Sequence, residues 1–325
     1  MTFNLADTPH FQDADKAREF LEAQRWPNGA VCPHCDSDVA YKLTGKPGSK
    51  KPVRKGVYKC KACEQQFTVT VNTIFEDSHI PLNKWLLAIH LLCASKKGMS
   101  AHQMHRMLGV TYKSAWFMAH RIRYMMSQPS YKSKLKGVVE ADETYVGGKR
   151  RNQGGVGRPD SYSHKQAVFS IVKRDGDVRS FHVQRVTGDN LMSVMTKNVH
   201  PNSIVMTDGF SSYDGVKARF GTHRVVNHSA GEYSRKEQGL PTIHTNTIEG
   251  VFGLLKRGLI GTYHQVGSHH LHRYLAEFDF RYNARKISDS ERTELALSQA
   301  EGKRLQLRDS IKPLLAHRTA PDGAI

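Results

Sequence analysis

Two aspartates in the second half of the chain have the type and setting that metal-dependent phosphate chemistry requires. Asp142 ends the apolar stretch VVEAD, and Asp208 ends the stretch IVMTD. A carboxylate at the end of a buried strand is costly to bury alone, so it is expected to be exposed, paired or bound to a cation. Two such aspartates in one domain predict a shared Mg²⁺ or Mn²⁺ site, because these ions prefer oxygen ligands and also bind phosphate oxygens.

A third ligand is expected from the segment HTNTIEGVFGLLKRG at 244–258. On a helix, Glu249 and Lys256 lie on one face, and Asn246 lies one turn before Glu249. Glu249 would then complete the metal site, and Lys256 would contact a phosphate backbone. Each acid taken singly also has an ordinary explanation, such as a turn aspartate before Gly209 or a glutamate favoured by a helix dipole.

Two further glutamates flank the first aspartate. Glu140 shares a strand face with Asp142, because alternate residues of a strand point the same way. We therefore expect Glu140 to lie beside the metal site without being a ligand. Glu143 is expected to face solvent at the end of the strand.

Four of the five cysteines form two C-x-x-C pairs. Each pair can place two thiolates on one tetrahedral ion, so the four sulfurs predict a closed, structural Zn²⁺ site with these ligands: Cys32, Cys35, Cys60 and Cys63. Thioredoxin-like redox chemistry needs one such pair at a helix start, not two facing pairs. Cys93 lies on an apolar helical stripe and is expected to be a buried core residue.

The elements that must position these groups fall into two sets. From residue 137 onward, strands are predicted at 138–142, 167–173, 178–185 and 203–207, with a possible fifth at 224–228. Helices are predicted at 188–198, 245–257 and 268–286. The Gly-rich basic stretch at 147–161 is predicted to be an exposed loop. The predicted order, β-β-β-α-β-α-β-α, indicates a domain of mixed α and β structure.

The N-terminal set contains the cysteine pairs and several helices. Helices are predicted at 12–25 and from Pro81 onward, and QFTVTVNTIF at 66–75 is predicted to be a strand. Two helices within 98–126, with Ser100 and Thr111 as N-caps, have the length and turn of a helix-turn-helix. The alternative is an ordinary helical hairpin.

If the second of these helices starts near Tyr112, it presents two groups of side chains to a nucleic acid. Tyr112, Lys113 and Ser114 would reach base edges in a major groove. Arg121 and Arg123 would point outward and contact phosphates.

The charge balance agrees with a nucleic-acid partner. The chain has 48 Lys and Arg against 30 Asp and Glu, a formal net charge of +18. A polyanion is the natural partner of such a protein. No apolar run approaches the roughly 20 residues needed to cross a bilayer, and the N-terminus lacks an apolar signal core. We therefore expect no membrane association and a cytoplasmic, nucleoid-associated protein.

Several motifs, taken in order, resemble one known family. VVEADETYVGGK, VMTDGFSSY, HTNTIEGVFGLLKRGLIGTYH and YLAEFDFRYNAR resemble the ISXO2-like transposases of the IS1595 family of insertion sequences. The N-terminal zinc ribbon belongs to the same pattern, so the resemblance spans roughly residues 15–290. It implies an RNase H-like catalytic domain of the DDE type, with a mixed sheet flanked by helices.

The resemblance also implies an activity and residue roles. The activity is DNA cleavage and strand transfer at element ends, the chemistry of transposition. Asp142 and Asp208 match the first two catalytic acids, Glu249 the third, and Lys256 the lysine that follows it. Some branches of the family have asparagine in the third position, so Asn246 is the alternative to Glu249.

From these roles we expect Asp142 to bridge two Mg²⁺ or Mn²⁺ ions, with Asp208 and Glu249 each completing one coordination shell. The expected partners are double-stranded DNA, namely the inverted repeats of the element and a target. A homodimer or larger assembly is expected, because two element ends must be joined in one event. The rival functions are a catalytically silent DNA-binding regulator derived from a transposase and an RNase H-like RNA nuclease.

The predicted organisation is an α+β or α/β multidomain chain. Its parts are an N-terminal helix at 1–29, a zinc ribbon at 30–76, a helical DNA-binding region at 77–130, the catalytic domain at 137–290 and a basic C-terminal tail at 291–325.

Overall fold

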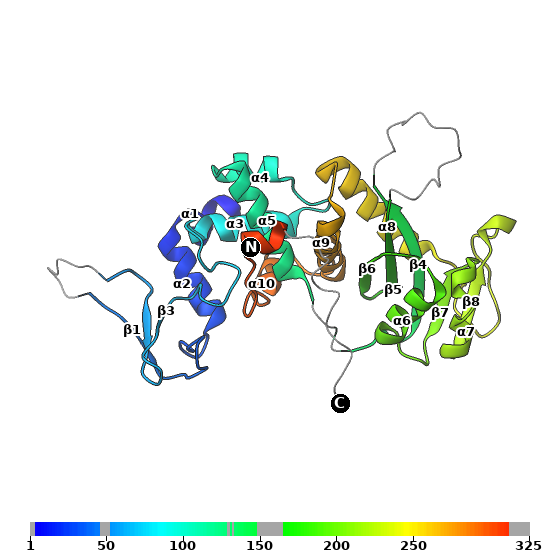
Figure 1. The fold of residues 1–325 in the computed structure, drawn as a ribbon, viewed down its shortest axis with the longest axis horizontal. Coiled ribbons are helices and arrows are strands. Elements are labelled where there is room, and N and C mark those ends of the chain that lie inside the picture. The colour runs from blue at the N-terminus through cyan, green and yellow to red at the C-terminus, as the bar shows by residue number, and fades with distance from the viewer. Residues whose placement is uncertain (1–3, 46–52, 129–130, 132, 148–164, 312–325) are drawn as a thin grey trace. The chain divides into compact units, whose positions relative to one another are not determined.

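The computed structural model describes residues 4–45, 53–128, 131, 133–147 and 165–311 (Figure 1). The described residues form two compact units, one made of 4–126 with 287–311 and the other of 127–286. Among the helices in these ranges, none is long and apolar enough to span a membrane. The loop predicted at 147–161 lies outside the described residues, apart from Gly147.

The second unit is built on a five-stranded sheet. Its strands are β4 (Val138–Val146), β5 (Gln166–Lys173), β6 (Val178–Val183), β7 (Ile204–Asp208) and β8 (Thr222–Val226). They lie in the order β6-β5-β4-β7-β8. The first three pair antiparallel, whereas β7 runs parallel to both β4 and β8. This mixed sheet, flanked by helices, confirms the predicted RNase H-like fold.

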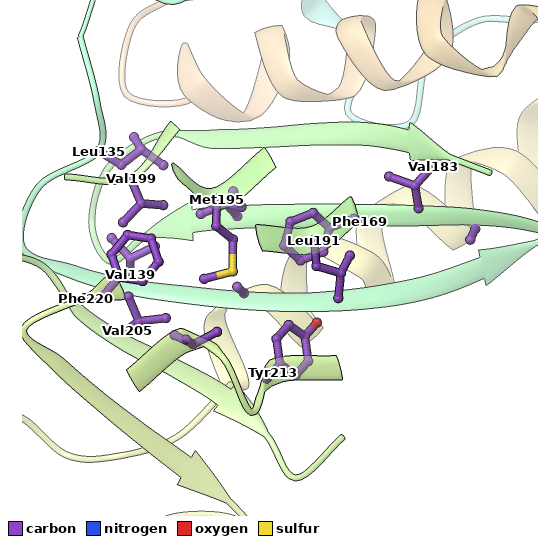
Figure 2. Packing of buried hydrophobic residues seen from close by; sticks show 14 residues of the cluster. Leu135, Val139, Phe169, Val183, Leu191, Met195, Val199, Val205, Tyr213 and Phe220 are labelled. Atoms are coloured by element: carbon purple, nitrogen blue, oxygen red, sulfur yellow. The ribbon is translucent and has the colours of Figure 1, made fainter. Parts of the chain in front are cut away.

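Helices cover both faces of this sheet. They are α6 (Gly188–Asn198), α7 (Val216–Arg219), α8 (Asn246–Gly258) and α9 (Leu271–Asn283), with short turns at Ser211–Tyr213 (η2), His228–Ala230 (η3), Leu259–Tyr263 (η4) and Ser268–His270 (η5). Phe169 packs with Leu191 and Met195 of α6 (Figure 2). Val168, on the opposite face, packs in one cluster with Leu255 of α8 and Leu275 of α9. Because neighbours on a strand point to opposite faces, β5 is apolar almost throughout.

One difference from the expected strand bounds changes the setting of Asp142. The strand β4 continues to Val146, so Asp142 lies within it and does not end it. Its antiparallel partner β5 pairs with it as far as Gln166, which extends the ladder beyond the aspartate. The prediction for Asp208 is confirmed, because it is the last residue of β7.

The first unit contains a three-stranded ribbon and a set of helices. Its strands are β1 (Ala40–Lys42), β2 (Tyr58–Cys60) and β3 (Gln66–Phe67), which pair antiparallel in that order. Its helices are α1 (Pro9–Gln12), α2 (Ala14–Arg25), α3 (Leu82–Ala94), α4 (Ala101–Leu108), α5 (Tyr112–Met126), α10 (Asp289–Leu297) and α11 (Leu307–Ile311), after the turn Leu5–Asp7 (η1). The helix predicted at 12–25 and the helix after Pro81 are confirmed.

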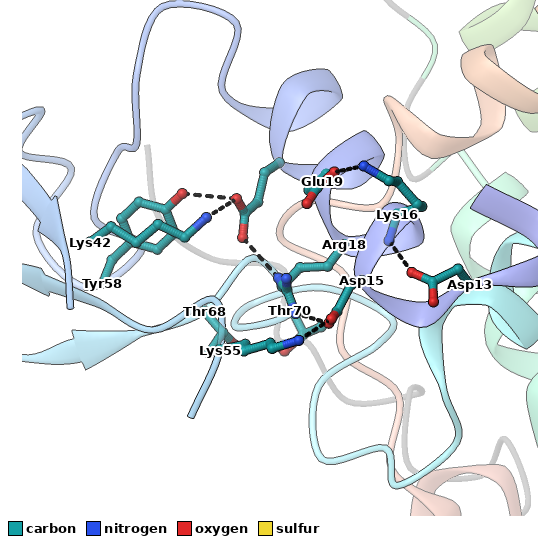
Figure 3. Close-up of polar contacts among 11 residues, drawn as sticks. Asp13, Asp15, Lys16, Arg18, Glu19, Lys42, Lys55, Tyr58, Thr68 and Thr70 are labelled. Carbon is teal, nitrogen blue, oxygen red and sulfur yellow. Dashed lines mark hydrogen bonds and ion pairs between the residues drawn. The ribbon is translucent and has the colours of Figure 1, made fainter. Parts of the chain in front are cut away.

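Polar contacts join α2 to the ribbon. Glu22 of α2 accepts hydrogen bonds from Lys42 Nζ at 2.8 Å and from Tyr58 Oη at 2.9 Å, and Lys55 pairs with Asp15 (Figure 3). The side chain of Asp13 caps the start of α2 by accepting from the Lys16 N–H. The short ribbon is therefore supported by a helix as well as by its cysteines.

The strand predicted at 66–75 is wrong after its first two residues. Beyond Phe67 the chain turns repeatedly, and the hydroxyl of Thr73 donates to the Thr70 carbonyl at 2.6 Å. Ile74 and Phe75 are fully buried in this turn region. Apolar residues that alternate in sequence are buried here by turns, because local threonine hydrogen bonds compete with strand pairing.

The basic tail predicted from residue 291 is also wrong for its described part. Ser288 forms a capping box with Glu291 at the start of α10, and α10 packs against α3. Thr293 is buried and its hydroxyl is hydrogen-bonded to His90 Nδ1 at 3.0 Å. The chain therefore returns to the first unit after completing the second. The other predicted domain boundaries stay predictions.

Candidate functional site

The four paired cysteines form one cluster in the first unit. Their sulfur atoms all lie within 4.8 Å of one another. The Sγ atoms of Cys32 and Cys63 are 3.7 Å apart, as are those of Cys35 and Cys60. Four sulfurs about 2.3 Å from a tetrahedral Zn²⁺ would be separated by roughly 3.8 Å, so the donor set fits zinc in both chemistry and spacing.

The two cysteine turns have the same backbone pattern. The Cys32 N–H donates to the Ser37 carbonyl at 2.9 Å, and the Cys60 N–H donates to the Gln65 carbonyl at 3.0 Å. The residue after each second cysteine has a positive φ, 58° at Asp36 and 59° at Glu64. Two identical turns facing one another are the construction expected of a zinc ribbon.

The predicted catalytic acids meet on the sheet of the second unit. The strands β4 and β7 are parallel neighbours, with Glu140 opposite Met206, so Asp142 and Asp208 lie two residues further along the same pair of strands. Burial raises the pKa of Asp142 to about 8, with further contributions from the nearby charges of Glu143, Asp208 and Glu249. The parallel register of β4 and β7 therefore places the two aspartates on neighbouring strands at the same level of the sheet.

Glu249 reaches this group from the first turn of α8. Its Oε1 accepts a hydrogen bond from the Thr245 hydroxyl at 3.2 Å and lies 3.5 Å from His228 Nε2. The side chain is about half exposed, at 51%. Asn246 and Lys256 are also exposed on the same helix, as the helical spacing predicts.

The acids do not form a closed cage. Among the described residues, only the cysteine cluster brings three or more ligand atoms within 4.8 Å of one another. Asp142, Asp208 and Glu249 are therefore close enough to repel but are spread more widely than the sulfurs. A site of this kind leaves space for several waters or phosphate oxygens around a cation.

Glu143 was expected to face solvent, and this prediction is wrong. Its carboxylate accepts a hydrogen bond from the Tyr213 hydroxyl at 2.6 Å. Burial raises the pKa of Glu143, and the charge of Asp208 raises it further, against the opposing effect of the Tyr213 hydrogen bond. Sequence reasoning missed the contact because Tyr213 is distant along the chain, although it stands in the same stretch, IVMTDGFSSY, as Asp208.

Glu140 lies on the same side of β4 as Asp142 but reaches a different partner. It is completely buried and pairs with Arg174, 2.6 Å from its Nε. Sequence reasoning missed Arg174 and also His228, which contacts Glu249. Neither residue stands in a recognisable spacing with the acids, so only the folded chain reveals these contacts.

The helix-turn-helix pattern of the first unit is present in α4 and α5. Ser100 caps α4, Gly109 ends it in the left-handed conformation, and the Thr111 hydroxyl accepts from the Ser114 N–H at 3.2 Å. Tyr112 and Lys113 are exposed at the start of α5, while Ser114 is half-buried. Their role in reading bases stays a prediction.

Arg121 and Arg123 do not point outward as expected. They are only 4% and 2% exposed. The Arg121 guanidinium donates to the Glu76 carbonyl at 2.5 Å and lies 5.6 Å from the ring centroid of Trp85. A buried arginine that is hydrogen-bonded to backbone and packed on an aromatic ring supports the fold. Phosphate contacts by these two residues are therefore not supported.

Two family models match the chain. The ISXO2-like transposase domain matches residues 134–283, and the transposase zinc-ribbon domain matches residues 12–66. An uncharacterized protein in transposable element ISH50 of Halobacterium salinarum is 28% identical over 284 residues, which cover 83% of this chain and 91% of that protein. Together these matches include both centres described above.

Solved structures show only distant likeness. The chain is similar to the Mos1 strand transfer complex with 12% identity and a TM-score of 0.27, over 66% of this chain and 74% of that chain. It is similar to a simian T-cell lymphotropic virus intasome bound to the PP2A regulatory subunit B56 gamma with 11% identity and a TM-score of 0.27. That match covers 60% of this chain and 65% of the other, just under two thirds of its length.

Proposed function

The chain belongs to the ISXO2-like transposases of the IS1595 family, and from this premise we propose that it cuts and joins DNA by divalent-metal chemistry at Asp142, Asp208 and Glu249. Its substrates would be the double-stranded inverted repeats of its own element and a target DNA. The family membership carries the transposase activity. The residue assignment is supported by the geometry of the acidic cluster.

One observation supports the metal assignment above all others: Asp142 and Asp208 lie on adjacent parallel strands, each two residues beyond the paired Glu140 and Met206. In agreement with this, burial and the neighbouring acids Glu143, Asp208 and Glu249 raise the pKa of Asp142 to about 8. Carboxylates crowded in this way repel one another unless a cation lies among them. Their hard oxygen donors suit Mg²⁺ or Mn²⁺, and the open arrangement leaves coordination positions for phosphate oxygens. The donor set therefore fits the ions that the reaction needs.

Each residue has a proposed task. Asp142 and Asp208, on adjacent strands, would hold the ions from the sheet, and Glu249 would hold them from α8. When bound, two divalent ions would activate the attacking water or 3′-hydroxyl and stabilise the leaving oxygen of an in-line displacement. Lys256, exposed two turns beyond Glu249, would contact the DNA backbone. Asn246 stays the alternative third ligand.

DNA binding would draw on both units. The net charge of +18 favours a polyanion, and the exposed Tyr112 and Lys113 at the start of α5 are the proposed contacts of the first unit. Zn²⁺ on the four cysteines would hold the ribbon in shape for this task. Because two element ends must be joined in one event, we also propose a dimer or larger assembly on DNA.

A cleavage assay tests the proposal against its rivals. Purified protein is incubated with labelled duplex DNA that carries an element end, with Mn²⁺, with Mg²⁺ or with neither. Cleavage and strand transfer that require the divalent ion support the proposal. Binding without cleavage under all three conditions would favour a silent DNA-binding regulator. Cleavage of an RNA–DNA hybrid in preference to duplex DNA would favour an RNA nuclease.

A further inference from the structure

Glu140 and Arg174 form an ion pair close to the proposed catalytic residue Asp142. Glu140 precedes Asp142 by two residues on β4 and has no exposed surface. Its Oε1 accepts from Arg174 Nε at 2.6 Å and from the Thr247 hydroxyl at 2.9 Å, and its Oε2 accepts from the Ile248 N–H at 3.0 Å. Both carboxylate oxygens are thus already occupied by protein donors.

The arginine of this pair extends the contact to the segment before α8. Its Nη1 donates to the Thr242 carbonyl at 2.6 Å, and its Nη2 donates to the His244 carbonyl at 2.9 Å. Arg174 itself is tied to the sheet, because its backbone N–H donates to the Val138 carbonyl at 3.0 Å. One guanidinium therefore joins Glu140 of β4 to two carbonyl groups of the segment before α8.

Two of the groups that donate to Glu140, the Thr247 hydroxyl and the Ile248 N–H, belong to the first turn of α8. The first N–H groups of a helix have no partner within the helix, and a carboxylate there is favoured by the helix dipole. Glu140 supplies that carboxylate for Ile248, the residue directly before Glu249. The position of Glu249 relative to Asp142 is therefore set by a side chain on the same strand as Asp142.

We propose that Glu140, together with Arg174, is a positioning residue that holds the first turn of α8 so that Glu249 faces Asp142. The proposal rests on the proposed function, because it assigns Glu249 to the metal site. Glu140 is not a ligand in this account, since both of its oxygens are engaged and no part of it reaches solvent. Arg174 neutralises its charge and keeps it from adding to the crowded acids.

The substitution Glu140→Gln tests this directly. A carboxamide has one acceptor oxygen, so it can satisfy Arg174 or the Ile248 N–H but not both. The matched control is Glu277→Gln, which alters another completely buried glutamate, one paired with Arg281 within α9 of the same unit. Both variants remove one charge from an ion pair. Glu140 binds the first turn of α8, whereas Glu277 binds Arg281 of α9 and Tyr263 of η4.

Two measurements are made on the wild type and both variants. Hydrogen exchange of the amides at 245–250 is followed without DNA, and the Mn²⁺ concentration for half-maximal cleavage of an element end is determined. In Glu140→Gln we expect exchange at 245–250 to rise about tenfold and the Mn²⁺ requirement to rise about tenfold, the size expected when a buried N–H loses its acceptor. Glu277→Gln should leave both near the wild-type values.

Two results would overturn the proposal. One is unchanged hydrogen exchange at 245–250 in Glu140→Gln, whether or not cleavage is lost. If cleavage were lost while the first turn of α8 kept its protection from exchange, Glu140 would act as a ligand and not as a positioning residue. The other is an equal effect in Glu277→Gln, which would mark a general loss of stability. If Glu140→Gln does not fold, Arg174→Lys should show the same changes to a smaller degree, because lysine keeps the charge but not the fork of donors. If the wild type does not cleave DNA, the proposed function fails, but the structural role of Glu140 is still tested, because the exchange comparison needs no DNA.

Discussion

The two centres of this chain are built on opposite principles. The cysteine cluster is closed, with four soft ligands within 4.8 Å of one another on two matching turns. The acidic cluster is open, and its members come from β4, β7 and α8 of a well-packed unit. Closed four-ligand sites are typical of structural metals, and open sites with waters are typical of catalytic ones. The comparison indicates that zinc on the cysteines would stabilise the ribbon, whereas the packed sheet unit positions the acids proposed to bind the catalytic ions.

Energetics follow from this difference. The ribbon has three short strands and little apolar core, so Zn²⁺ binding is expected to supply much of its folding free energy. The sheet unit has an extensive buried core, so we expect it to fold without an ion. Its crowded acids are the groups whose mutual repulsion a divalent cation would reduce under the proposed function.

The largest expected effect comes from removing one acid of the open centre. Asp142→Asn or Asp208→Asn should reduce cleavage of element-end DNA by about a thousandfold or more, because a proposed ligand of the catalytic ions is lost. Binding of DNA in a gel-shift assay should stay within about twofold. The exposed Asp189 of α6 provides the control, since Asp189→Asn removes an equal charge from the same unit. Retained cleavage in Asp142→Asn would refute the assignment.

The closed centre should respond in the reverse manner. Cys60→Ser removes a zinc ligand, so zinc content should fall and the ribbon should lose several kcal/mol of stability. Binding of DNA should weaken, while Mn²⁺ binding by the sheet unit should persist. Cys93→Ala is the matched control, because Cys93 is buried on α3 away from the cluster. Metal content is measured by mass spectrometry. Equal loss of zinc in both variants would show that the cluster is not the zinc site.

A smaller difference separates the candidates for the third ligand. Glu249→Gln should lower the cleavage rate by at least about tenfold more than Asn246→Ala, because only Glu249 contributes charge to the environment of Asp142. Both residues are exposed on α8, so neither change should disturb the core. Rates are compared at saturating Mn²⁺. The opposite ranking would transfer the role to Asn246.

The smallest effect concerns a buried acid outside both centres. Burial raises the pKa of Asp279 to about 7, although the Ser180 hydroxyl and N–H oppose this by donating to it. The folded state therefore binds a proton that the unfolded state has already released above pH 4, and stability falls as pH rises from about 4 to about 7.

Between pH 5 and pH 8 the sheet unit should lose about 2 kcal/mol through this residue. The pH-dependent loss should shrink by about this amount in Asp279→Asn, and the difference between wild type and variant should not change with Mg²⁺, because Asp279 is compensated by hydrogen bonds. The pH dependence that remains is expected from Asp142, whose pKa is raised to about 8. Urea unfolding at both pH values measures the difference. If Mg²⁺ abolished the difference between wild type and Asp279→Asn, its origin would lie in the open centre.

Local spacing made both centres predictable. Two C-x-x-C pairs, and aspartates adjoining apolar strand residues, are local patterns that can be recognised without knowledge of the tertiary packing. The strand pairing then brought Asp142 and Asp208 together, as an RNase H-like order requires.

Long-range contacts were not predictable in the same way. Arg121 was expected at the surface because its side chain is charged, yet Trp85 and the Glu76 carbonyl enclose it. Glu143 looked exposed because its partner Tyr213 stands far along the chain. In each case a polar side chain is buried by one specific partner, and no periodicity in the sequence records such a pairing.

The central claim is that Asp142 and Asp208 share divalent ions. Crystals of the protein soaked in Mn²⁺ test it most directly through anomalous scattering. The account predicts anomalous density between these two carboxylates in the wild type and none there in Asp142→Asn. Mn²⁺ bound only at other residues, with the two carboxylates left without an ion, would contradict it.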